Sequence, residues 1–221
     1  MRRTTAAASI SSHARPARPG RPRTAEIVGR DERILRAASE VFLTCGFDRT
    51  SVDAIAESAR ISKRTIYNRY TDKATLFHAV LSDLINRWLV PLRQFSSEEG
   101  DLEQTLLALA HYLVTFALQP YSLNINRVVI SEAERWPELG RLVTERARKP
   151  AFQVIKSILV RHRSRLQDID LELAARHFMS FTVDSIVLSA HLAGIQSTSE
   201  NADEWVSASV KLFLRGILHR D

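Results

Sequence analysis

The apolar residues recur every three or four positions from about residue 31 onward, which is the spacing of an amphipathic helix. The first of these segments carries Ile34, Leu35, Ala38, Val41, Phe42 and Cys45. Asp31 is a suitable N-cap for this helix, and Gly46 is a suitable C-terminal stop. The pattern then predicts a short helix after Ser51, a second short helix after Ser62 and a longer helix after Thr71.

Longer helices follow in the rest of the sequence, and no segment alternates in the manner of a strand. Gly100 and Asp101 open a helix that ends before Pro120 and is apolar around most of its circumference, which is typical of a helix buried in a bundle. The further helices cover about 122–134, 137–164, 170–193 and 202–219. The sequence therefore predicts an all-α protein.

Positive charge is concentrated at the N-terminus. The first 30 residues hold seven arginines and one acid, Glu26, so their net charge of +6 equals that of the whole chain. We interpret residues 1–29 as a disordered basic arm, and such an arm on a nearly neutral body indicates a polyanionic partner. A disordered tail that only raises solubility is the alternative.

The remaining composition narrows the class of protein. A single cysteine, Cys45, excludes an intramolecular disulfide and indicates a reducing compartment. No apolar run approaches the length of a membrane span, and the basic arm lacks the apolar stretch of a secretory signal. We therefore expect a cytoplasmic protein without a membrane partner.

The segment 51–70 contains two short helices that meet near Arg60 and Ile61. The second is barely two turns long, so it has to pack on a platform to be stable. Ile66 and Tyr70 are four residues apart and mark its packed side, which leaves the opposite face free. Side chains suited to base edges on the free face are Arg64, Thr65 and Asn68, and those suited to phosphates beside them are Lys63, Tyr67 and Arg69. An ordinary helical hairpin with a solvated polar face is the alternative, and the outward chemistry favours DNA.

One ordered pattern runs without a gap from about Arg33 to Leu84. It consists of Thr50-Ser51-Val52, Ile55-Ala56, Ala59, Ile61-Ser62, Thr65-Ile66-Tyr67, Tyr70, Lys73 and Leu76. This pattern resembles the DNA-binding head of TetR/AcrR-family regulators. A shorter stretch, Val129–Leu139, resembles the AefR-like C-terminal domains of that family, although a helix start with Pro137 in its first turn would give the same pattern.

The resemblance implies a set of DNA-binding residues. Thr65, Tyr67 and Lys73 would help to hold the DNA, and positions 63, 64, 68 and 69 would tune the sequence that is read. Ser51, at the start of the first short helix, joins this candidate site. The chain departs from the family at Arg60, where a glycine is usual in the turn. If that position needs a positive φ, arginine costs on the order of 1 kcal/mol there.

The basic arm has a motif of its own. Arg18-Pro-Gly-Arg-Pro-Arg23 resembles the arginine-proline clamps that lie in the minor groove of A·T-rich DNA. Proline keeps such an arm extended, and arginine favours a narrow and strongly negative groove. We expect Arg18, Arg21 and Arg23 to bind DNA beside each half-site. A tail without a role in binding is the alternative.

Catalytic and metal-binding patterns are missing from the sequence. His177, Asp184 and His191 recur every seven residues, which places neighbours about 10 Å apart along a helix. One metal cannot join them, because its ligand bonds are about 2 Å long. The sequence has no glycine-rich phosphate loop, no cysteine pair and no nucleophile elbow. We therefore expect no enzyme activity, no cofactor and no metal.

A small effector would instead need an apolar cavity with a few oriented polar contacts. The resemblance, rather than the periodicity, implies that such a cavity lies in the helical body. The candidate lining residues are His111, Tyr112, Thr115, Arg127, His177, Phe178, Phe181 and Asp184. For any one of them, packing in the core or at an interface is the alternative.

The expected organisation is a helix-turn-helix DNA-binding domain at residues 30–75 followed by a helical regulatory and dimerisation domain at residues 76–221. By resemblance, the last two helices form the interface of a homodimer, because their apolar residues exceed what one bundle face needs. These residues are Leu188, Leu192, Val210, Leu212, Phe213, Leu214 and Ile217.

A dimer of this kind would present two recognition helices to a palindromic operator in double-stranded DNA. We expect a repressor, associated with the bacterial nucleoid when bound, that an unknown small and mostly apolar effector releases from DNA. A ligand-independent architectural DNA-binding protein is the alternative, and it would have a filled body without a cavity.

Overall fold

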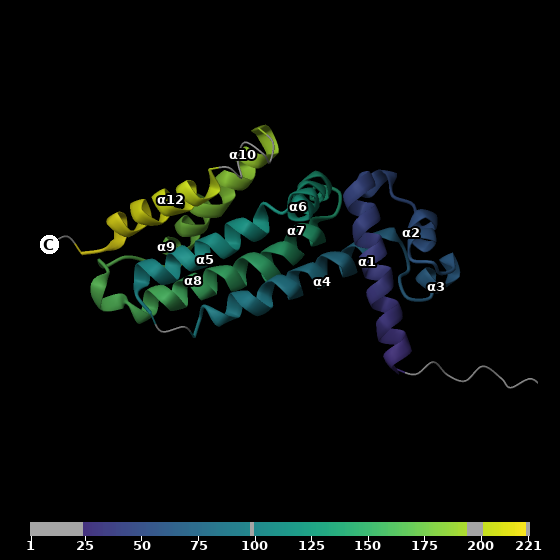
Figure 1. The fold of residues 1–221 in the computed structure, drawn as a ribbon, viewed down its shortest axis with the longest axis horizontal. Helices are drawn as coiled ribbons and strands as arrows, with labels where there is room; N and C mark the ends of the chain where they lie inside the picture. Colours follow the sequence, from purple (N-terminus) through teal and green to yellow (C-terminus); the bar gives the residue numbers. More distant parts are fainter. Residues whose placement is uncertain (1–23, 98–99, 194–200, 220–221) are drawn as a thin grey trace, which may run out of the picture.

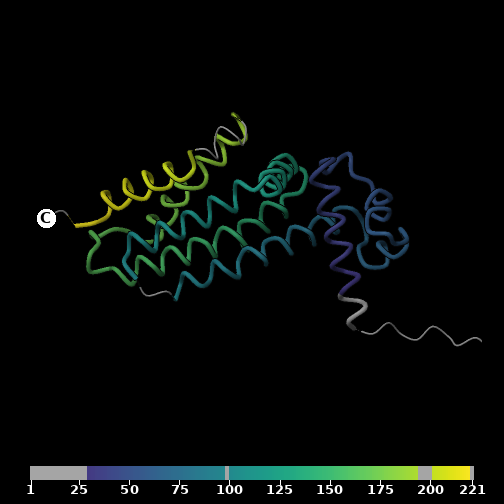
Figure 2. The backbone as a smooth tube through the Cα atoms, in the orientation of Figure 1, coloured from purple at the N-terminus to yellow at the C-terminus, as the bar shows by residue number. Residues whose placement is uncertain are grey.

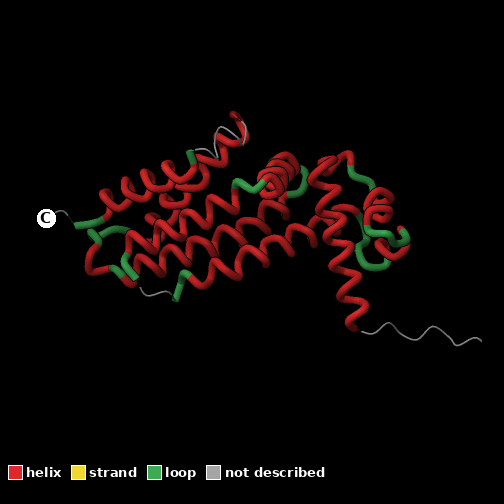
Figure 3. The backbone as a smooth tube through the Cα atoms, in the orientation of Figure 1, coloured by secondary structure: helices red, strands yellow, loops and turns green. Residues whose placement is uncertain are grey.

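The computed structural model describes residues 24–97, 100–193 and 201–219. Apart from one isolated bridge, the regular elements among these residues are all helical (Figure 3). Figure 1 shows an elongated molecule with a small head of short helices at one end and a body of long helices beside it. The tube in Figure 2 shows that the long helices of the body run roughly along one axis and that α1 crosses this axis. The prediction of an all-α fold is confirmed.

The head is built from α1 (Thr24–Arg49), α2 (Val52–Ser58) and α3 (Lys63–Tyr67). The Ser51 hydroxyl caps α2 by accepting a hydrogen bond from the backbone N–H of Ala54, and the Ser62 hydroxyl caps α3 in the same way from Thr65. The next helix, α4 (Lys73–Gln94), begins at the Asp72 cap and continues without a break into the body. The predicted boundary between residues 75 and 76 therefore falls inside a continuous helix.

The body continues through α5 (Leu102–Ala117), α6 (Pro120–Glu132), α7 (Pro137–Val143), α8 (Lys149–Arg161), α9 (Leu171–Met179), α10 (Ser185–Ala193) and α12 (Ala202–Ile217). Helix α8 packs on α9, and α12 packs on α5. Helix α5 lies in the middle of the body, and its Leu106, Leu109 and Ala110 are fully buried, as its nearly continuous apolar surface predicts. Truncation of such a leucine to alanine costs roughly 2–5 kcal/mol.

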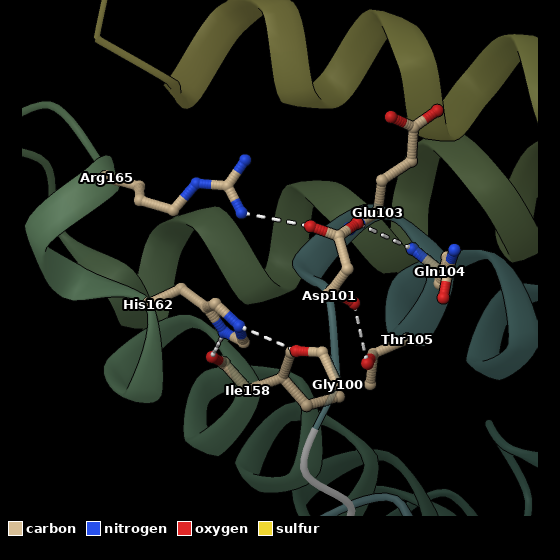
Figure 4. Close-up of polar contacts among 8 residues, drawn as sticks. All are labelled: Gly100, Asp101, Glu103, Gln104, Thr105, Ile158, His162 and Arg165. Atoms are coloured by element: carbon tan, nitrogen blue, oxygen red, sulfur yellow. Dashed lines mark hydrogen bonds and ion pairs between the residues drawn. The ribbon is translucent and has the colours of Figure 1, made fainter.

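Polar contacts join the helix ends at the end of the body that is remote from the head (Figure 4). Asp101 caps α5 by accepting hydrogen bonds from the backbone amides of residues 103 and 104, and Arg165 donates to its other carboxylate oxygen at 3.1 Å. The His162 Nε2 atom lies 3.1 Å from the carbonyl oxygen of Gly100. A bridge between Leu166 and Leu218 ties the C-terminal helix to the same end.

Helix α1 begins earlier than the sequence predicts. It starts at Thr24, so the predicted disorder of residues 24–29 and the predicted N-cap at Asp31 are wrong. The segment holds no proline after Pro22, and the cost of Gly29, about 1 kcal/mol relative to alanine, is small within a helix of 26 residues. Gly46 does interrupt the regular helix, with φ 77° and ψ 169°. Residues 1–23, which include the predicted minor-groove clamp, lie outside the described residues.

Two single turns of π-helix interrupt segments that the sequence predicts as continuous α-helices. The turn Thr144–Arg148 joins α7 to α8, and the turn Ser180–Asp184 joins α9 to α10. Pro150 follows the first turn closely, and its ring has no N–H and would clash with the carbonyl four residues earlier in a regular α-helix. A local widening of the helix removes that conflict.

Candidate DNA-binding surface and ligand cavity

The short helix α3 is held on a platform by its buried side. Ile66 is 1% exposed and Tyr70 is 8% exposed, which confirms that these two residues form the packed face. The Ser62 Oγ atom accepts from the backbone N–H of Thr65 at 3.2 Å and lies 2.8 Å from the Thr65 hydroxyl. The cap and the packed face together fix a helix of five residues that would not form alone.

The opposite face of α3 is open to solvent. Arg64, Tyr67 and Asn68 are exposed, and Thr65 is half-buried beside its cap. The side chains of Arg64 and Asn68 have no hydrogen-bond partner within the described parts of the chain. A guanidinium and an amide that are not used by the fold can each make two hydrogen bonds to a base edge in a major groove.

Two of the predicted phosphate ligands carry ion pairs within the head. The Lys63 ammonium lies 2.8 Å from an Asp53 carboxylate oxygen of α2, and the hydrogen bond between them raises the pKa of Lys63. Arg69 forms a 2.9 Å ion pair with Asp31 of α1. The first pair connects α3 to α2, and the second connects the turn after α3 to α1. Both the arginine and the lysine head groups remain solvent-accessible, so a phosphate could compete for them.

The last two predicted DNA ligands take part in the fold of the head. Ser51 uses its hydroxyl to cap α2. The Lys73 ammonium donates to three carbonyl oxygens, at 2.8 Å to Phe47, 3.2 Å to Asp48 and 3.0 Å to Thr50. A contact from Lys73 to a phosphate would have to replace one of these three hydrogen bonds.

The turn between α2 and α3 contains the departure from the family pattern. Arg60 has a φ of 54°, and among the residues with described backbone it is the non-glycine residue with a positive φ. Its backbone N–H donates to Glu57 and the N–H of Ile61 donates to Ala56, both at 3.0 Å. This pair of hydrogen bonds is the Schellman motif, in which glycine is the usual residue at the position of Arg60.

The body contains an apolar cavity of about 180 Å³ between α4, α5, α6 and the two π-turns. Its walls are Leu81, Leu84, Ile85, Trp88, Leu113, Phe116, Ala117, Tyr121, Ser122, Ile125, Asn126, Val129, Val143, Ala147, Met179, Val183 and Val187. Among the described residues, no charged side chain and no histidine belongs to this wall. A charged molecule would therefore lose its hydration without a compensating partner.

A few polar groups do reach the cavity wall. The Trp88 Nε1 atom and the Ser122 hydroxyl are buried without a hydrogen-bond partner among the described residues. Burial raises the pKa of Tyr121, and the neighbouring Ser122 partly offsets this rise. Asn126 lies 3.1 Å from His191 Nε2, and burial together with the positive charge of Arg127 lowers the pKa of that imidazole. Unpaired buried donors are costly, so a ligand that accepted from them would gain affinity.

None of the predicted pocket residues lines this cavity. His111 and Thr115 lie together on another face of α5, where they line a second pocket of about 360 Å³ with Asp203 of α12. Tyr112 donates its hydroxyl proton to the backbone carbonyl of Trp88 at 2.6 Å. The predicted residues and this cavity do not coincide, because the polar exceptions on α5 point away from the cavity, while its lining has the residue types of an ordinary core.

The remaining predicted pocket residues lie at the surface, at an ion pair or in the core. Arg127, His177 and Phe181 are exposed, and Phe178 is fully buried. Asp184 forms a two-pronged ion pair with Arg148, with distances of 2.8 and 2.9 Å. This pair connects the two π-turns that border the cavity.

Helix α6 touches both the cavity and the head. Its Ser122 and Asn126 line the cavity, and the side-chain amide of Asn124 donates to the Leu43 carbonyl of α1 at 3.4 Å. Just after α6, the ring of Trp136 packs edge-on against Phe47 with 4.6 Å between centroids. A shift of α6 caused by a ligand would therefore act directly on α1.

A row of large apolar side chains is exposed on α10, α12 and the π-turn before α10. These residues are Phe181 (46% exposed), Leu188 (58%), Leu192 (79%), Trp205 (40%) and Leu212 (60%). Large apolar side chains exposed to this degree on these segments favour an interaction site. Four other residues predicted for the interface are instead buried within the chain, namely Val210, Phe213, Leu214 and Ile217.

No single described helix is long and apolar enough to cross a membrane. Only the pair α5 and α6, which is bent by 72°, reaches the required length and hydropathy together.

A small helix-turn-helix head joined to a larger helical body defines a DNA-binding transcriptional regulator. Residues 34–80 match the family described as bacterial regulatory proteins, tetR family. Residues 104–216 match the AefR-like transcriptional repressor, C-terminal domain. The chain therefore belongs to the TetR family of transcriptional regulators, which are not enzymes.

Similar proteins cover different shares of the chain. The HTH-type transcriptional activator FasR of Mycolicibacterium smegmatis is 30% identical over 64% of this chain and 68% of its own length. The HTH-type regulator Mb1581 of Mycobacterium bovis is 34% identical over 55% of this chain and 54% of its own length, so the chain spans about half of that protein. A TetR-family crystal structure from Mesorhizobium loti has a TM-score of 0.76 and 28% identity, and the match covers 87% of this chain and 98% of that one.

Proposed function

We propose that the protein binds a palindromic operator as a homodimer and releases it when an uncharged, mostly apolar molecule occupies the body. The observation that carries the DNA-binding part is α3, a capped recognition helix whose exposed Arg64 and Asn68 are not used by the fold. These side chains would read base edges in the major groove, and Tyr67 and Lys63 would position the helix on phosphates.

Arg64→Ala and Asn68→Ala test base reading. Each change should weaken binding to the preferred sequence by about 1–3 kcal/mol and relax the preference at one base pair of each half-site. Arg93→Ala in α4 is a matched control, because Arg93 is also exposed and lies far along the body. The assay is fluorescence anisotropy with labelled duplexes that carry each base at each position. Equal loss on all duplexes would contradict base reading by these residues.

The exposed apolar row on α10 and α12 supports the homodimer. Two copies of this row can face each other across a two-fold axis, which would place two recognition helices on successive major grooves about 34–36 Å apart. Leu212→Glu should convert the dimer to a monomer in sedimentation-velocity runs and abolish binding to the palindrome. Val160→Glu replaces a similarly exposed apolar residue on α8 and should leave the dimer intact. A dimer that survives Leu212→Glu would contradict this interface.

The chemistry of the cavity supports an uncharged effector. The described part of its wall is mostly apolar and carries no charged group, and the Trp88 Nε1 donor has no partner among the described residues. Ala147→Phe should fill part of the space, preserve operator affinity and remove the response to the effector, whereas Val160→Phe outside the cavity should preserve both. Effectors can be found by screening neutral apolar compounds for operator release. By thermodynamic linkage, operator DNA must weaken effector binding by the same factor by which the effector weakens DNA binding.

We propose repression as the transcriptional output. The C-terminal match to the AefR-like repressor domain supports it, while the similar FasR is named an activator. A reporter driven by a promoter that contains the selected operator decides between the two, because deletion of the regulator raises expression for a repressor and lowers it for an activator. A ligand-independent architectural role would be supported instead if no compound released DNA and Ala147→Phe changed nothing.

A further inference from the structure

Three exposed arginines of the head surround a groove next to the recognition helix. The groove has a volume of about 310 Å³ and lies between α1 and the turn that joins α2 to α3. Its walls are Arg33, Arg36, Ala37, Glu40, Ser58, Ala59 and Arg60. Three guanidinium groups against one carboxylate leave this groove with an excess of positive charge.

The three guanidinium groups are not used by the fold. The side chains of Arg33, Arg36 and Arg60 have no hydrogen bond or ion pair to another described residue, not even to Glu40 in the same groove. Several arginines of the body are instead held in ion pairs, namely Arg148–Asp184, Arg163–Asp168, Arg165–Asp101 and Arg176–Glu172. Solvated arginines without internal partners are available to an external anion.

Arg60 occupies its place at a conformational cost. Its φ of 54° is a value that favours glycine, and its position in the Schellman motif is the one where glycine is usual. Strained residues of this kind are found where the side chain serves a function that outweighs the strain. The Arg60 side chain makes no hydrogen bond or ion pair within the described chain, so its guanidinium is available to a partner outside the fold.

The groove residues lie close in the chain to the recognition helix and to the basic arm. Arg60 is followed directly by the α3 cap and by Arg64 on the recognition helix, while Arg33 and Arg36 lie on α1, which follows the basic arm in the chain. A helix that reads a major groove is bordered by sugar-phosphate backbone, which proteins bind with arginine and lysine. We propose that the groove formed by Arg33, Arg36 and Arg60 binds the phosphate backbone beside the major groove that α3 reads, an inference that rests on the proposed DNA-binding function.

The proposed contact has a defined thermodynamic signature. A guanidinium matches the geometry of a phosphate and makes two parallel hydrogen bonds to it. Such a contact carries no base information, so it raises affinity for every duplex equally. Each phosphate contact makes the fall of log affinity with log salt concentration steeper by about 0.9. Relative to 1 M salt, one such contact therefore raises the DNA affinity at 150 mM salt by about fivefold.

The first test is the double variant Arg33→Gln/Arg36→Gln, with Arg93→Gln as the matched control for loss of an unpaired arginine on the body. Anisotropy titrations between about 100 and 300 mM salt should show a slope reduced by about two for the double variant and unchanged for the control. Affinity should fall by the same factor for operator and for scrambled DNA. Glu40→Gln should act in the opposite direction and tighten binding, because it removes the one carboxylate of the groove.

The second test separates the charge of Arg60 from the conformation of the turn. Arg60→Gly should raise the urea midpoint, because the strain is removed, and yet weaken DNA binding about fivefold with a slope reduced by about one. Arg60→Asn, which also tolerates positive φ, should weaken binding to the same extent.

The proposal is overturned if the double variant and Arg93→Gln have equal affinities and slopes, or if Arg60→Gly binds as tightly as the unchanged protein. It is also overturned if the variants lose affinity for the operator alone. The failure of the unchanged protein to prefer any DNA sequence would instead contradict the proposed function.

Discussion

Lys73→Met distinguishes a structural lysine from a phosphate ligand. The resemblance to the family implies that Lys73 holds DNA, whereas in the structure its ammonium donates to three carbonyl oxygens that end α1 and precede α2. The ammonium also lies 4.4 Å from the centroid of the Phe47 ring. Methionine keeps most of the apolar length of the side chain and removes the charge, so the change isolates these polar contacts.

The expected loss can be worked out contact by contact. Hydrogen bonds from a charged donor contribute about 1.5–3 kcal/mol each, and the low end applies to the two part-buried bonds, to Phe47 and Thr50. The third bond is exposed, so water replaces it at little cost. We therefore expect Lys73→Met to lower the free energy of unfolding by about 3 kcal/mol, a large part of the about 5–15 kcal/mol that is typical of a folded protein.

Urea unfolding at one fixed protein concentration measures this loss, because dimerisation makes the midpoint depend on concentration. Lys149→Met is the matched control. Its ammonium pairs with Glu145 on the surface, at 2.7 Å, so its removal should cost less than about 0.5 kcal/mol. The reasoning is refuted if Lys73→Met unfolds at the original midpoint but reduces the salt slope of DNA binding by about one, because Lys73 would then act as a phosphate ligand.

Three further predictions concern the link between head and body, the π-turns and the pH dependence of stability. Trp136→Ala removes the contact with Phe47 and should reduce the response of DNA binding to the effector, measured as the ratio of operator affinities with and without effector; an unchanged ratio would show that the signal travels elsewhere. Asp184→Asn leaves Arg148 half-exposed without its anion and should lower the free energy of unfolding by only about 0.5–1 kcal/mol in urea titrations, with a larger loss indicating a role beyond the ion pair. The arginine and the backbone amides around Asp101 (Figure 4) hold the pKa of its carboxyl below the usual value, so its contribution to stability is present above the unfolded pKa of about 3.9 and lost as pH falls through the folded pKa. Asp101→Asn should therefore make stability less dependent on pH between about pH 5 and 3, and an unchanged pH profile would contradict this assignment.

Local signals in the sequence are sufficient to predict most of the helices of the fold. The sequence predicts helix starts after Ser62, at Asp101 and at about residue 170, and in the structure Ser62, Asp101 and Asp170 cap these helices by accepting backbone hydrogen bonds. The positive φ considered for Arg60 is also present. Caps and turns depend on a few consecutive residues, so their chemistry is visible before any tertiary contact is known. The start of α1 was missed because Thr24 carries no equally strong signal.

The cavity could not be located from the sequence. Its wall consists mostly of leucines, valines and aromatic residues. These cannot be distinguished from core residues until the packing of the eight helical segments that contribute them is known. The polar residues chosen instead, such as His111 and Asp184, mark other contacts. The apolar row at the surface was identified only in part for a similar reason. The helical periodicity of α12 shows that Leu212 and Phe213 lie on different faces of the helix. Only the packing shows that other parts of the same chain bury Phe213.

Selection of bound duplexes from a random DNA pool at about 150 mM salt, followed by sequencing, tests the central claim most directly. We expect a palindromic consensus whose half-sites are one helical turn apart, with base preferences that change in the Arg64→Ala and Asn68→Ala variants. Recovery of A·T-rich DNA without a repeated pattern would contradict sequence-specific binding by the recognition helices and would favour an architectural role carried by the basic arm.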